Sequence, residues 1–308
     1  MSNPINVCLS CDDNYVQHAG VVIASILANA NDSDDLHFYI LNNGISQEQR
    51  NKLNELKNIK NFELNFVDVD ENNFEDYKSV STHKYITLPS YYRLKFPSIF
   101  PYLDRVIYFD CDVVVNTSLS ELFNIEIKNY PVAGAPDIDK KDVKRNPTCV
   151  NSGVLIMDLK NMREQNIEQK FLEWTKVHIN TIKKGDQEIL NETLKGNVLI
   201  IDKDWNVQSS NFTNRSSYTN APKIIHFVAK KKPWHYASFS VHRDLYFKYL
   251  QLTPWKLNEK DYKHWTKDNQ IASLFAYVKY RPFFAFRPKF YKALYFTYIH
   301  PLFTEKRH

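Results

Sequence analysis

The stretch VIYFDCDVVV, residues 106–115, places the carboxylates of Asp110 and Asp112 one residue apart within an apolar run. Side chains alternate between the faces of a strand, so both carboxylates project from one face, at the strand's carboxyl end. That edge of an α/β sheet is where ligands bind. Neighbouring, partly desolvated carboxylates are costly, and a hard divalent cation such as Mg²⁺ or Mn²⁺ would relieve the cost. The alternative is a strand end whose carboxylates cap backbone amides.

The D-x-D spacing alone is a weak signal, because the chain contains five such pairs. Asp32 and Asp34 lie in an N-D-S-D-D turn, and Asp202 and Asp204 close a predicted strand before Trp205, so loop chemistry explains both pairs. The pair within 106–115 differs, because apolar residues lie on both sides of it. We therefore take this pair as the candidate metal site.

The first two-thirds of the chain alternates short apolar runs with helical patterns, which is typical of an α/β sheet with crossover helices. Ser46 and Gln49 predict a capping box at the start of one helix. The predicted strands cover 5–11, 36–42, 62–69, 105–110, 154–159, 197–202 and 223–228. The predicted helices cover 16–28, 46–57, 88–96, 163–177 and 186–194, with Pro97 ending the third.

Composition is that of a globular enzyme: 308 residues, 43% hydrophobic and 24% charged. The net charge of +5 is mild, but basic residues gather after Lys223, which indicates an anionic partner for the C-terminal half. We interpret the cysteines, including Cys8 and Cys11, as reduced packing residues of a cytosolic protein. Neither a signal-peptide pattern nor about 18 consecutive apolar residues occurs, so we expect no secretion signal and no membrane span.

Seven blocks of this sequence, in this order, resemble glycosyltransferase family 8, and within it the bacterial lipopolysaccharide and lipooligosaccharide galactosyl- and glucosyltransferases. The blocks are LSCDDNY (9–15), YYRLKFP (91–97), VIYFDCDVVV (106–115), AGAPD (133–137), NSGVLIMDL (151–159), GDQEILN (185–191) and KIIHFVAKKKPWH (223–235). The resemblance spans about residues 6–235. It implies a GT-A fold, which is a Rossmann-like α/β nucleotide-sugar-binding fold with a mixed central sheet. It further implies a UDP-hexose donor, Mn²⁺ with Mg²⁺ as a substitute, and transfer with retention of configuration.

The same resemblance assigns roles residue by residue. Asp110 and Asp112 match the metal-binding pair, and His226 matches the third protein ligand. Of the donor-binding positions, Ser10, Asp12 and Asn14 match the contacts to uracil and ribose, and Arg93 matches an arginine that reaches the sugar. Asn151 and Ser152 match the pair at the sugar hydroxyls, and Lys232 matches the lysine at the diphosphate. The catalytic positions beside the hexose are Asp137, Asp186 and Gln187.

Each of these residues also has a structural interpretation from the sequence alone. The D-D-N-Y segment is a turn or helix cap, and Tyr15 either stacks on the base or packs beneath it. In this interpretation Arg93 is an exposed helix cation, His226 is a structural histidine, and Lys232 is part of a solvated charge run. Asp186 begins a helix as its cap, Asp137 lies in a loop, and the polar pair before G-V-L-I-M forms a bulge.

Gln187 bears on the mechanism that the resemblance implies. A double-displacement enzyme needs a carboxylate nucleophile beneath the anomeric carbon, and an amide is a poor nucleophile. Front-face substitution is therefore favoured, with the leaving diphosphate taking the acceptor proton. The sequence departs from the family at Ala229 and Lys230, where the lipooligosaccharide galactosyltransferases have Gly-Pro, and in the acceptor region 83–89, so the acceptor is known only by class.

From about Leu252 the pattern changes, and we divide the chain into a GT-A catalytic domain, 1–250, and a basic, aromatic C-terminal helical tail, 251–308. Residues 278–303 interleave Tyr and Phe with Lys and Arg, and prolines break them into short helices. Such a tail favours an anionic membrane surface, which suits a lipid-linked oligosaccharide acceptor at the inner face of the bacterial cytoplasmic membrane. We expect no nucleic-acid partner, although aromatic and basic residues also occur in single-strand binders. The alternative is a terminal helix docked on the main domain.

Two other functions compete with the hexosyltransferase prediction. A metal-dependent nucleotidyltransferase would need a Gly-rich phosphate loop after the first strand, and none of the six glycines lies there. A catalytically silent sugar- or lipid-binding protein would keep the same pattern without turnover.

Overall fold

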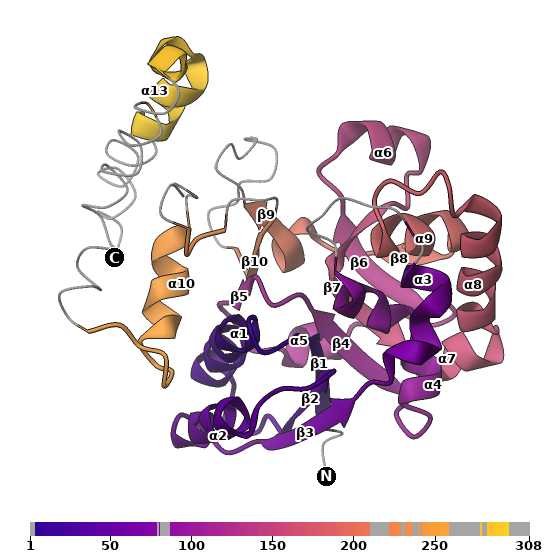
Figure 1. The fold of residues 1–308 in the computed structure, drawn as a ribbon, viewed down its shortest axis with the longest axis horizontal. Coiled ribbons are helices and arrows are strands. Elements are labelled where there is room, and N and C mark those ends of the chain that lie inside the picture. Colours follow the sequence, from indigo (N-terminus) through magenta and orange to yellow (C-terminus); the bar gives the residue numbers. More distant parts are fainter. Residues whose placement is uncertain are drawn as a thin grey trace.

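The computed structural model describes residues 4–78, 80, 87–209, 222–228, 232–235, 240, 242–258, 278 and 282–295. A seven-stranded sheet with the order β3-β2-β1-β4-β7-β6-β8 forms its centre (Figure 1). These strands are β1 (Ile5–Ser10), β2 (Leu36–Asn42), β3 (Glu63–Asp68), β4 (Arg105–Phe109), β6 (Val132–Pro136), β7 (Val150–Asp158) and β8 (Val198–Ile200). A second sheet contains β5 (Val113–Val115), β10 (Ile224–Phe227) and β9 (Val207–Ser209), in that order.

The direction of β7 makes the central sheet mixed. Strands β1 to β4 pair in parallel, whereas β7 runs antiparallel to both of its neighbours, β4 and β6. The carboxyl ends of β1, β4 and β6 therefore meet the amino end of β7 at one edge. Polar segments that follow or precede these strands are brought together there, which is the ligand-binding edge of an α/β sheet.

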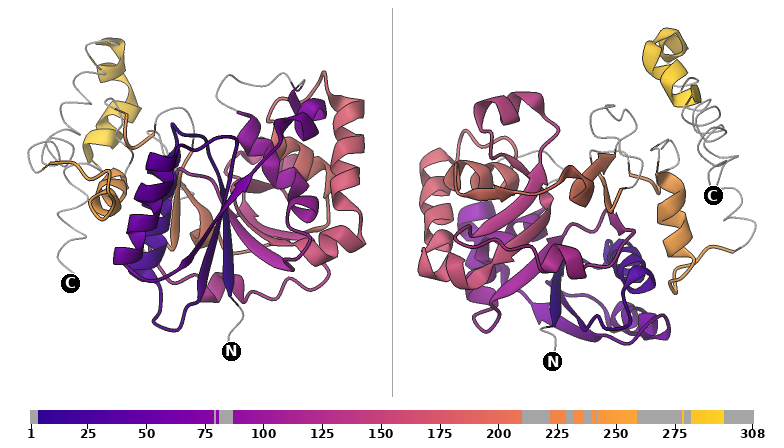
Figure 2. Two further views of the ribbon diagram at one scale, coloured as in Figure 1. Left: turned by 60° about the horizontal axis from the view of Figure 1, so that its bottom comes forward. Right: turned by 180° about the vertical axis from the view of Figure 1, so that it is seen from behind.

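Helices cover both faces of the sheet. In both views of Figure 2, α1 (Val16–Asn29) and α10 (Arg243–Leu250) lie on one side, and α8 (Ile167–His178) and α9 (Asp186–Thr193) on the other. The other helices formed by the described residues are α2 (Gln47–Glu55), η1 (Leu56–Asn58), η2 (Glu71–Phe74), α3 (Glu75–Lys78), η3 (Leu88–Lys95), α4 (Phe96–Ile99), α5 (Ser120–Phe123), α6 (Lys140–Arg145), α7 (Leu159–Glu164), η4 (Lys203–Asn206), η6 (Pro282–Phe286) and α13 (Pro288–Leu294).

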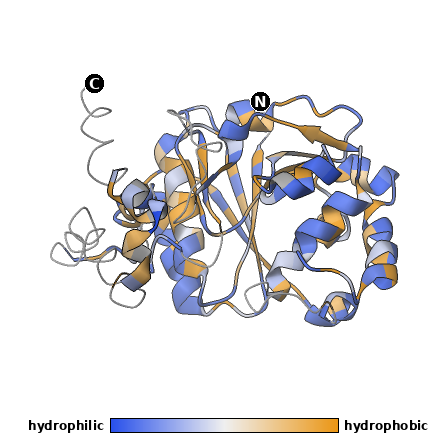
Figure 3. Cartoon of the chain, turned by 90° about the horizontal axis from the view of Figure 1, so that it is seen from above, coloured by the Kyte–Doolittle hydropathy of each residue, from blue (hydrophilic) through white to orange (hydrophobic). Residues whose placement is uncertain are grey.

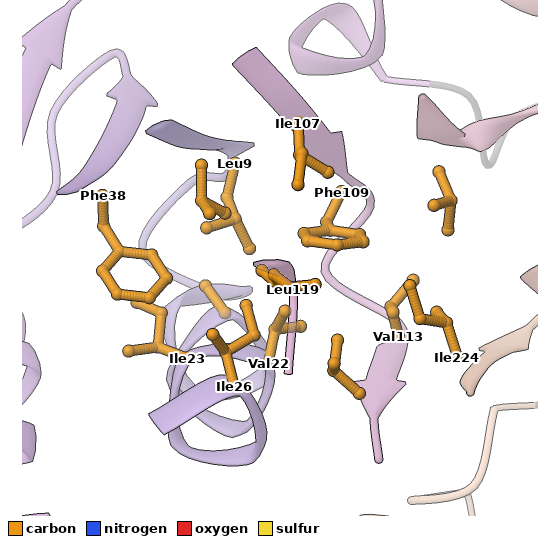
Figure 4. Close-up of a cluster of buried hydrophobic side chains, with 14 of the residues drawn as sticks. Leu9, Val22, Ile23, Ile26, Phe38, Ile107, Phe109, Val113, Leu119 and Ile224 are labelled. Carbon is orange, nitrogen blue, oxygen red and sulfur yellow. The ribbon is translucent and has the colours of Figure 1, made fainter. Parts of the chain in front are cut away.

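The period-two alternation of the central strands places their apolar side chains in two clusters, one on each face of the sheet, and a third cluster packs α10 against β5 and β10. Leu9 and Ile107 point toward α1 and pack with Val22 in one cluster (Figure 4). Tyr108, next to Ile107 in the chain, points the other way and packs with Phe171 of α8. Each fully buried side chain of this size contributes about 1.5–3 kcal/mol. In Figure 3 the outer helices carry apolar residues on one side and polar residues on the other, as amphipathic helices do.

Several local predictions were wrong for identifiable reasons. The helix expected over 163–177 is interrupted, because Asn166 is left-handed (φ 52°) between α7 and α8. The capping box does not form: the Ser46 hydroxyl donates to Asp13 Oδ1 (3.0 Å), while Gln49 Oε1 accepts from Trp255 Nε1 (3.1 Å).

The segment 88–96 is also different from its prediction. Residues 88–95 form a 3₁₀ helix, η3, and Phe96 begins α4. Pro97 lies in the first turn of α4, where its missing N–H costs nothing, instead of ending a helix. Strand β7 begins at Val150, four residues before the predicted start. The sequence patterns did not reveal β6, α6 or α10.

Two short helices near the C-terminus, η6 and α13, begin at Pro282 and Pro288, in agreement with the expected breaks. The other residues from 259 onward, apart from 278, 287 and 295, lie outside the described ranges, as do 79 and 81–86. Within the described ranges, no helix is both long enough and apolar enough to span a bilayer. All four cysteines are buried and free, as the sequence predicted.

Candidate active site

Three ligand-type side chains converge at the sheet edge. Asp110 directly follows β4, Asp112 precedes β5, and β10 pairs antiparallel to β5 so that His226 lies opposite Val113. One ligand atom from each of Asp110, Asp112 and His226 lies within 4.8 Å of the others. The Nε2 atom of His226 is 3.6 Å from Asp110 Oδ2 and 3.1 Å from Asp112 Oδ1. The structure thus brings the three predicted metal ligands together.

The backbone is shaped to let these side chains meet. Asp110 N donates to the carbonyl oxygen of Gly153 at 2.9 Å, which ties the end of β4 to β7. A Cβ atom on Gly153 would lie 2.1 Å from His226 Cε1 and 2.7 Å from Asp110 Oδ2. Only glycine permits the imidazole and the carboxylate to pack this closely against β7.

Lys232 supplies a positive charge to this cluster. Its Nζ contacts Asp112 Oδ2 and donates to the carbonyl oxygen of Phe227 at 2.8 Å. Burial alone would raise the pKa of Asp112, but Lys232 and then His226 more than offset it and hold that pKa well below its usual range. Asp112 is therefore ionised at neutral pH.

The cluster fits a divalent cation. Asp112 Oδ1 is buried and accepts no hydrogen bond within the described part of the chain, although His226 Nε2 lies beside it. A buried carboxylate oxygen without a donor is costly, and a cation bound by two carboxylates and an imidazole would satisfy it. Asp110, Asp112 and His226 are the residues that would hold such an ion.

Arg93 is buried beside two carboxylates, those of Asp110 and Asp186, so it is not the exposed helix cation of the alternative interpretation. Its side chain is 2% exposed, and Nη2 donates to Asp110 Oδ1 at 2.6 Å and to the Tyr108 hydroxyl at 2.7 Å. Nη1 donates to Ser152 O at 2.5 Å, and Nε lies 3.4 Å from Asp186 Oδ2. Burial would lower the pKa of Arg93, but Asp110 and Asp186 raise it, so the guanidinium stays charged.

Asp186 is the first residue of α9, after Gly185 at the N-cap position, and not the cap itself. It is 5% exposed, and its Oδ2 accepts from the Ser152 hydroxyl at 3.1 Å. Burial raises the pKa of Asp186 to about 6, against the opposing effect of Arg93. The buried carboxylate of Asp186 can bind a hydroxyl-bearing ligand through a strong hydrogen bond.

Gln187 is held by three polar partners. Its Oε1 accepts from Asn151 Nδ2 and from Ser152 N, both at 3.1 Å, and its Nε2 donates to Asp137 Oδ2 at 2.7 Å. Asp137 follows β6 directly, so the carboxyl end of β6 and the start of β7 fix this amide between them. The three predicted catalytic residues and the predicted pair of Asn151 and Ser152 thus form one connected group with Arg93.

The predicted nucleotide-binding residues lie at the end of β1. Asp12 Oδ1 accepts from the backbone amides of Asn14 and Tyr15 (3.1 and 3.0 Å), so the turn interpretation of this segment holds as a local structure. Ser10 Oγ is buried without a hydrogen-bond partner among the described residues. Tyr15 is 43% exposed and lies edge-on to Trp234, with ring centroids 6.3 Å apart. An exposed ring beside an open turn provides a surface for a planar base.

Two residues of the site were not identified from the sequence. Tyr108 donates to Asp110 Oδ1 at 2.8 Å, and Asn206 Oδ1 lies 3.2 Å from His226 Nδ1. Tyr108 stands two residues before Asp110, on the same strand face, so alternation could have revealed it; no signal was visible for Asn206. Ala229 and Lys230, and residues 83–86 of the acceptor region, lie outside the described ranges.

Comparisons with known proteins agree with this architecture. A family model described as Glycosyl transferase family 8 matches residues 6–238. General stress protein A of Bacillus subtilis (strain 168) is 30% identical over 270 residues, and the match covers 80% of this chain and 93% of that protein. The lipopolysaccharide 1,2-glucosyltransferase of Escherichia coli is 28% identical over 301 residues, covering 90% of this chain and 86% of that protein.

A solved structure shows the same fold. The galactosyltransferase LgtC, in complex with donor and acceptor sugar analogues, matches with a TM-score of 0.71 and 23% identity over 83% of this chain and 98% of that chain. The chain therefore has the GT-A fold that the sequence predicted.

Proposed function

Because this chain belongs to glycosyltransferase family 8, we propose that it moves galactose or glucose from a UDP-sugar to the saccharide of a lipopolysaccharide or lipooligosaccharide. Its membership makes it a glycosyltransferase that uses a nucleotide-sugar donor and an oligosaccharide acceptor. The observation that carries the finer proposal is the convergence of Asp110, Asp112 and His226 beside the Arg93, Asp186 and Gln187 group.

The charges of the site residues indicate which part of the donor each residue would bind. Asp110, Asp112 and His226 would hold Mn²⁺, or Mg²⁺ in its place. The bound ion would stabilise the negative charge that develops on the departing diphosphate. Lys232, a second positive charge beside Asp112, would donate hydrogen bonds to the same diphosphate. Asp12, Asn14 and the backbone at Ser10 would bind the uridine.

The hexose would lie against the polar group on β7 and α9. Asp186 and the pair Asn151 and Ser152 would hydrogen-bond its hydroxyl groups, with Arg93 keeping Asp186 in place. Asp137 would face the sugar and the acceptor while orienting Gln187. Because these contacts fix the ring, the anomeric carbon would be held close to the acceptor hydroxyl, which is how positioning accelerates group transfer.

Retention of configuration is proposed from the state of Gln187. Its Oε1 already accepts two hydrogen bonds, from Asn151 Nδ2 and Ser152 N, so this oxygen is a poor nucleophile. Without attack from beneath, the diphosphate would leave and the acceptor would enter on the same face of an oxocarbenium-like ion pair. The leaving diphosphate would take the acceptor proton.

The donor test is an incubation of purified protein with Mn²⁺ and a panel of UDP-sugars, with release of UDP followed over time. We expect slow hydrolysis of UDP-galactose or UDP-glucose and of no other donor. Release of pyrophosphate from a nucleoside triphosphate and a sugar phosphate would instead favour the nucleotidyltransferase. If no donor turns over, the catalytically silent sugar- or lipid-binding protein is favoured. Transfer to an acceptor saccharide tests retention. The sugar is α-linked in the donor, so an axial anomeric proton signal in the product, which marks a β-linkage, would exclude retention.

We further propose that residues 251–308 contact the anionic inner face of the cytoplasmic membrane, beside a catalytic domain of residues 1–250. In support, Phe283, Phe286 and Tyr291 are 80%, 81% and 60% exposed around the exposed Arg287. Aromatic side chains favour the headgroup layer, and each cation near anionic lipid adds about 1 kcal/mol. The relative named for lipopolysaccharide glucosylation supports a lipid-linked acceptor.

Deletion of the residues after Phe275 tests the tail. Trp255 must be retained, because it packs against Gly20 of α1. We expect the shortened protein to keep activity toward short soluble acceptors and to sediment less with anionic vesicles than the full chain. Equal sedimentation of both proteins would exclude the membrane role.

A further inference from the structure

Two backbone amides at the start of β7 determine the orientation of the side-chain amides in the site. Gly153 N donates to Asn151 Oδ1 and Ser152 N donates to Gln187 Oε1, both at 3.1 Å. A backbone N–H can only donate, so the atom facing it must be the amide oxygen. Asn151 Nδ2 must then donate to Gln187 Oε1, and Gln187 Nε2 to Asp137 Oδ2.

The same polarity continues in the other direction, through Asn206. Asn206 Nδ2 donates to Asn151 Oδ1 at 3.0 Å, so Asn206 Oδ1 is the atom that faces His226 Nδ1, 3.2 Å away. An amide oxygen only accepts, and the Nδ1 atom of His226 must therefore carry a hydrogen. The lone pair of the neutral imidazole is left on Nε2, the atom that faces Asp110 and Asp112.

Asn206 is itself held rigidly by its surroundings. It is 2% exposed and ends η4, directly before β9, which pairs in parallel with β10, the strand of His226. The preceding residue, Trp205, is buried in the core, and Asp202 caps η4 by accepting from Asp204 N at 2.8 Å. The side chain of Asn206 is therefore presented to His226 from a fixed backbone.

We propose that Asn206 is a positioning residue that fixes His226 in the Nδ1–H tautomer needed for metal binding and joins the metal site to Asn151 and Gln187. The inference rests on the proposed metal dependence. Hydrogen-bond partners of a metal-ligating histidine orient the ring and raise its basicity, and their loss typically weakens metal affinity by about 10–100-fold. Asn206 performs this role with an amide in place of the usual carboxylate or carbonyl.

The test measures Mn²⁺ affinity directly, from the electron paramagnetic resonance signal of free Mn²⁺, without donor or turnover. Asn206→Ala loses both bonds, and we expect its affinity to fall by about 10–100-fold. Asn206→Asp keeps an acceptor for Nδ1–H but loses the donor to Asn151, so it should retain wild-type affinity and show a lower kcat. The matched control is Asn6→Ala, because Asn6 is also buried and donates to the Arg105 carbonyl at the opposite end of β1; its affinity should be unchanged.

The possible results are distinct. Wild-type binding with unchanged affinity in Asn206→Ala overturns this inference alone, and so does an equal loss in Asn206→Ala and Asn6→Ala. An Asn206→Asp affinity as low as that of Asn206→Ala overturns the tautomer role. Absence of Mn²⁺ binding by the wild type overturns the proposed metal dependence, and this inference with it. Should Asn206→Ala not fold, Asn206→Ser removes the amide and allows the same comparison.

Discussion

Replacement of Arg93 by methionine tests whether this buried guanidinium stabilises the site before any ligand binds. Methionine keeps much of the aliphatic length but removes the charge and the donors to Asp110, Tyr108 and Ser152. Removal of one partner from a buried ion pair costs roughly 3–5 kcal/mol, because it leaves an uncompensated charge. Asp110 keeps the Tyr108 hydroxyl and is 30% exposed, so the lower end, about 3 kcal/mol, is expected.

The loss should depend on pH through Asp186. Burial already raises the pKa of this carboxyl from 3.8 to about 6 in the presence of Arg93, which opposes the rise. Without Arg93 the folded-state pKa of Asp186 rises further above its unfolded value, so the folded variant binds more protons than the unfolded chain. The variant should therefore lose stability as pH rises from about 4, and differ less from wild type at pH 5 than at pH 7.

Urea unfolding of metal-free protein, followed by circular dichroism, measures these differences. The matched control is Arg145→Met, because Arg145 is 57% exposed and pairs with Glu192 at 2.6 Å. An exposed ion pair of this kind contributes at most about 1 kcal/mol. If Arg93→Met costs no more than the control, or costs the same at pH 5 and pH 7, the buried carboxylates do not depend on Arg93 and the reasoning is refuted.

Three further predictions concern Gly153, His18 and Asp112. Gly153→Ala should cost about 1–3 kcal/mol by overpacking against His226 and weaken Mn²⁺ binding; thermal unfolding and a metal titration measure both, and unchanged affinity would contradict the close packing. Burial lowers the pKa of His18 from 6.5 to about 3. Between these two pH values only the unfolded chain binds the proton, so the folded state loses stability as the pH is lowered, by about 2 kcal/mol at pH 5. The urea midpoint of His18→Asn should therefore decline less between pH 7 and pH 5 than that of the wild type; equal declines would count against it. Asp112→Asn should stay folded by circular dichroism yet lose the turnover that Mn²⁺ restores to EDTA-treated wild type, and retained activity would refute its role as a ligand.

Sequence reasoning reached the acidic pair, Asp110 and Asp112, because its signal is local. Two acids in an apolar strand end conflict with burial, and the conflict is visible within ten residues of sequence. His226 came only from the family resemblance, since a single histidine at a strand end has many explanations. Arg93 shows the limit of local patterns: an arginine in a short helical segment predicts an exposed cation, but the residue is 2% exposed between two carboxylates from distant segments.

The sequence alone determined the α/β class, most strands of the central sheet and the acidic pair, because hydrophobic periodicity and charge placement act over a few residues. The tertiary structure decided which atoms meet. The reversal of β7 brings Asn151 to Gln187, and the pairing of β9 with β10 brings Asn206 to His226. Such contacts depend on strand direction and register over long sequence separations, which local residue patterns do not show.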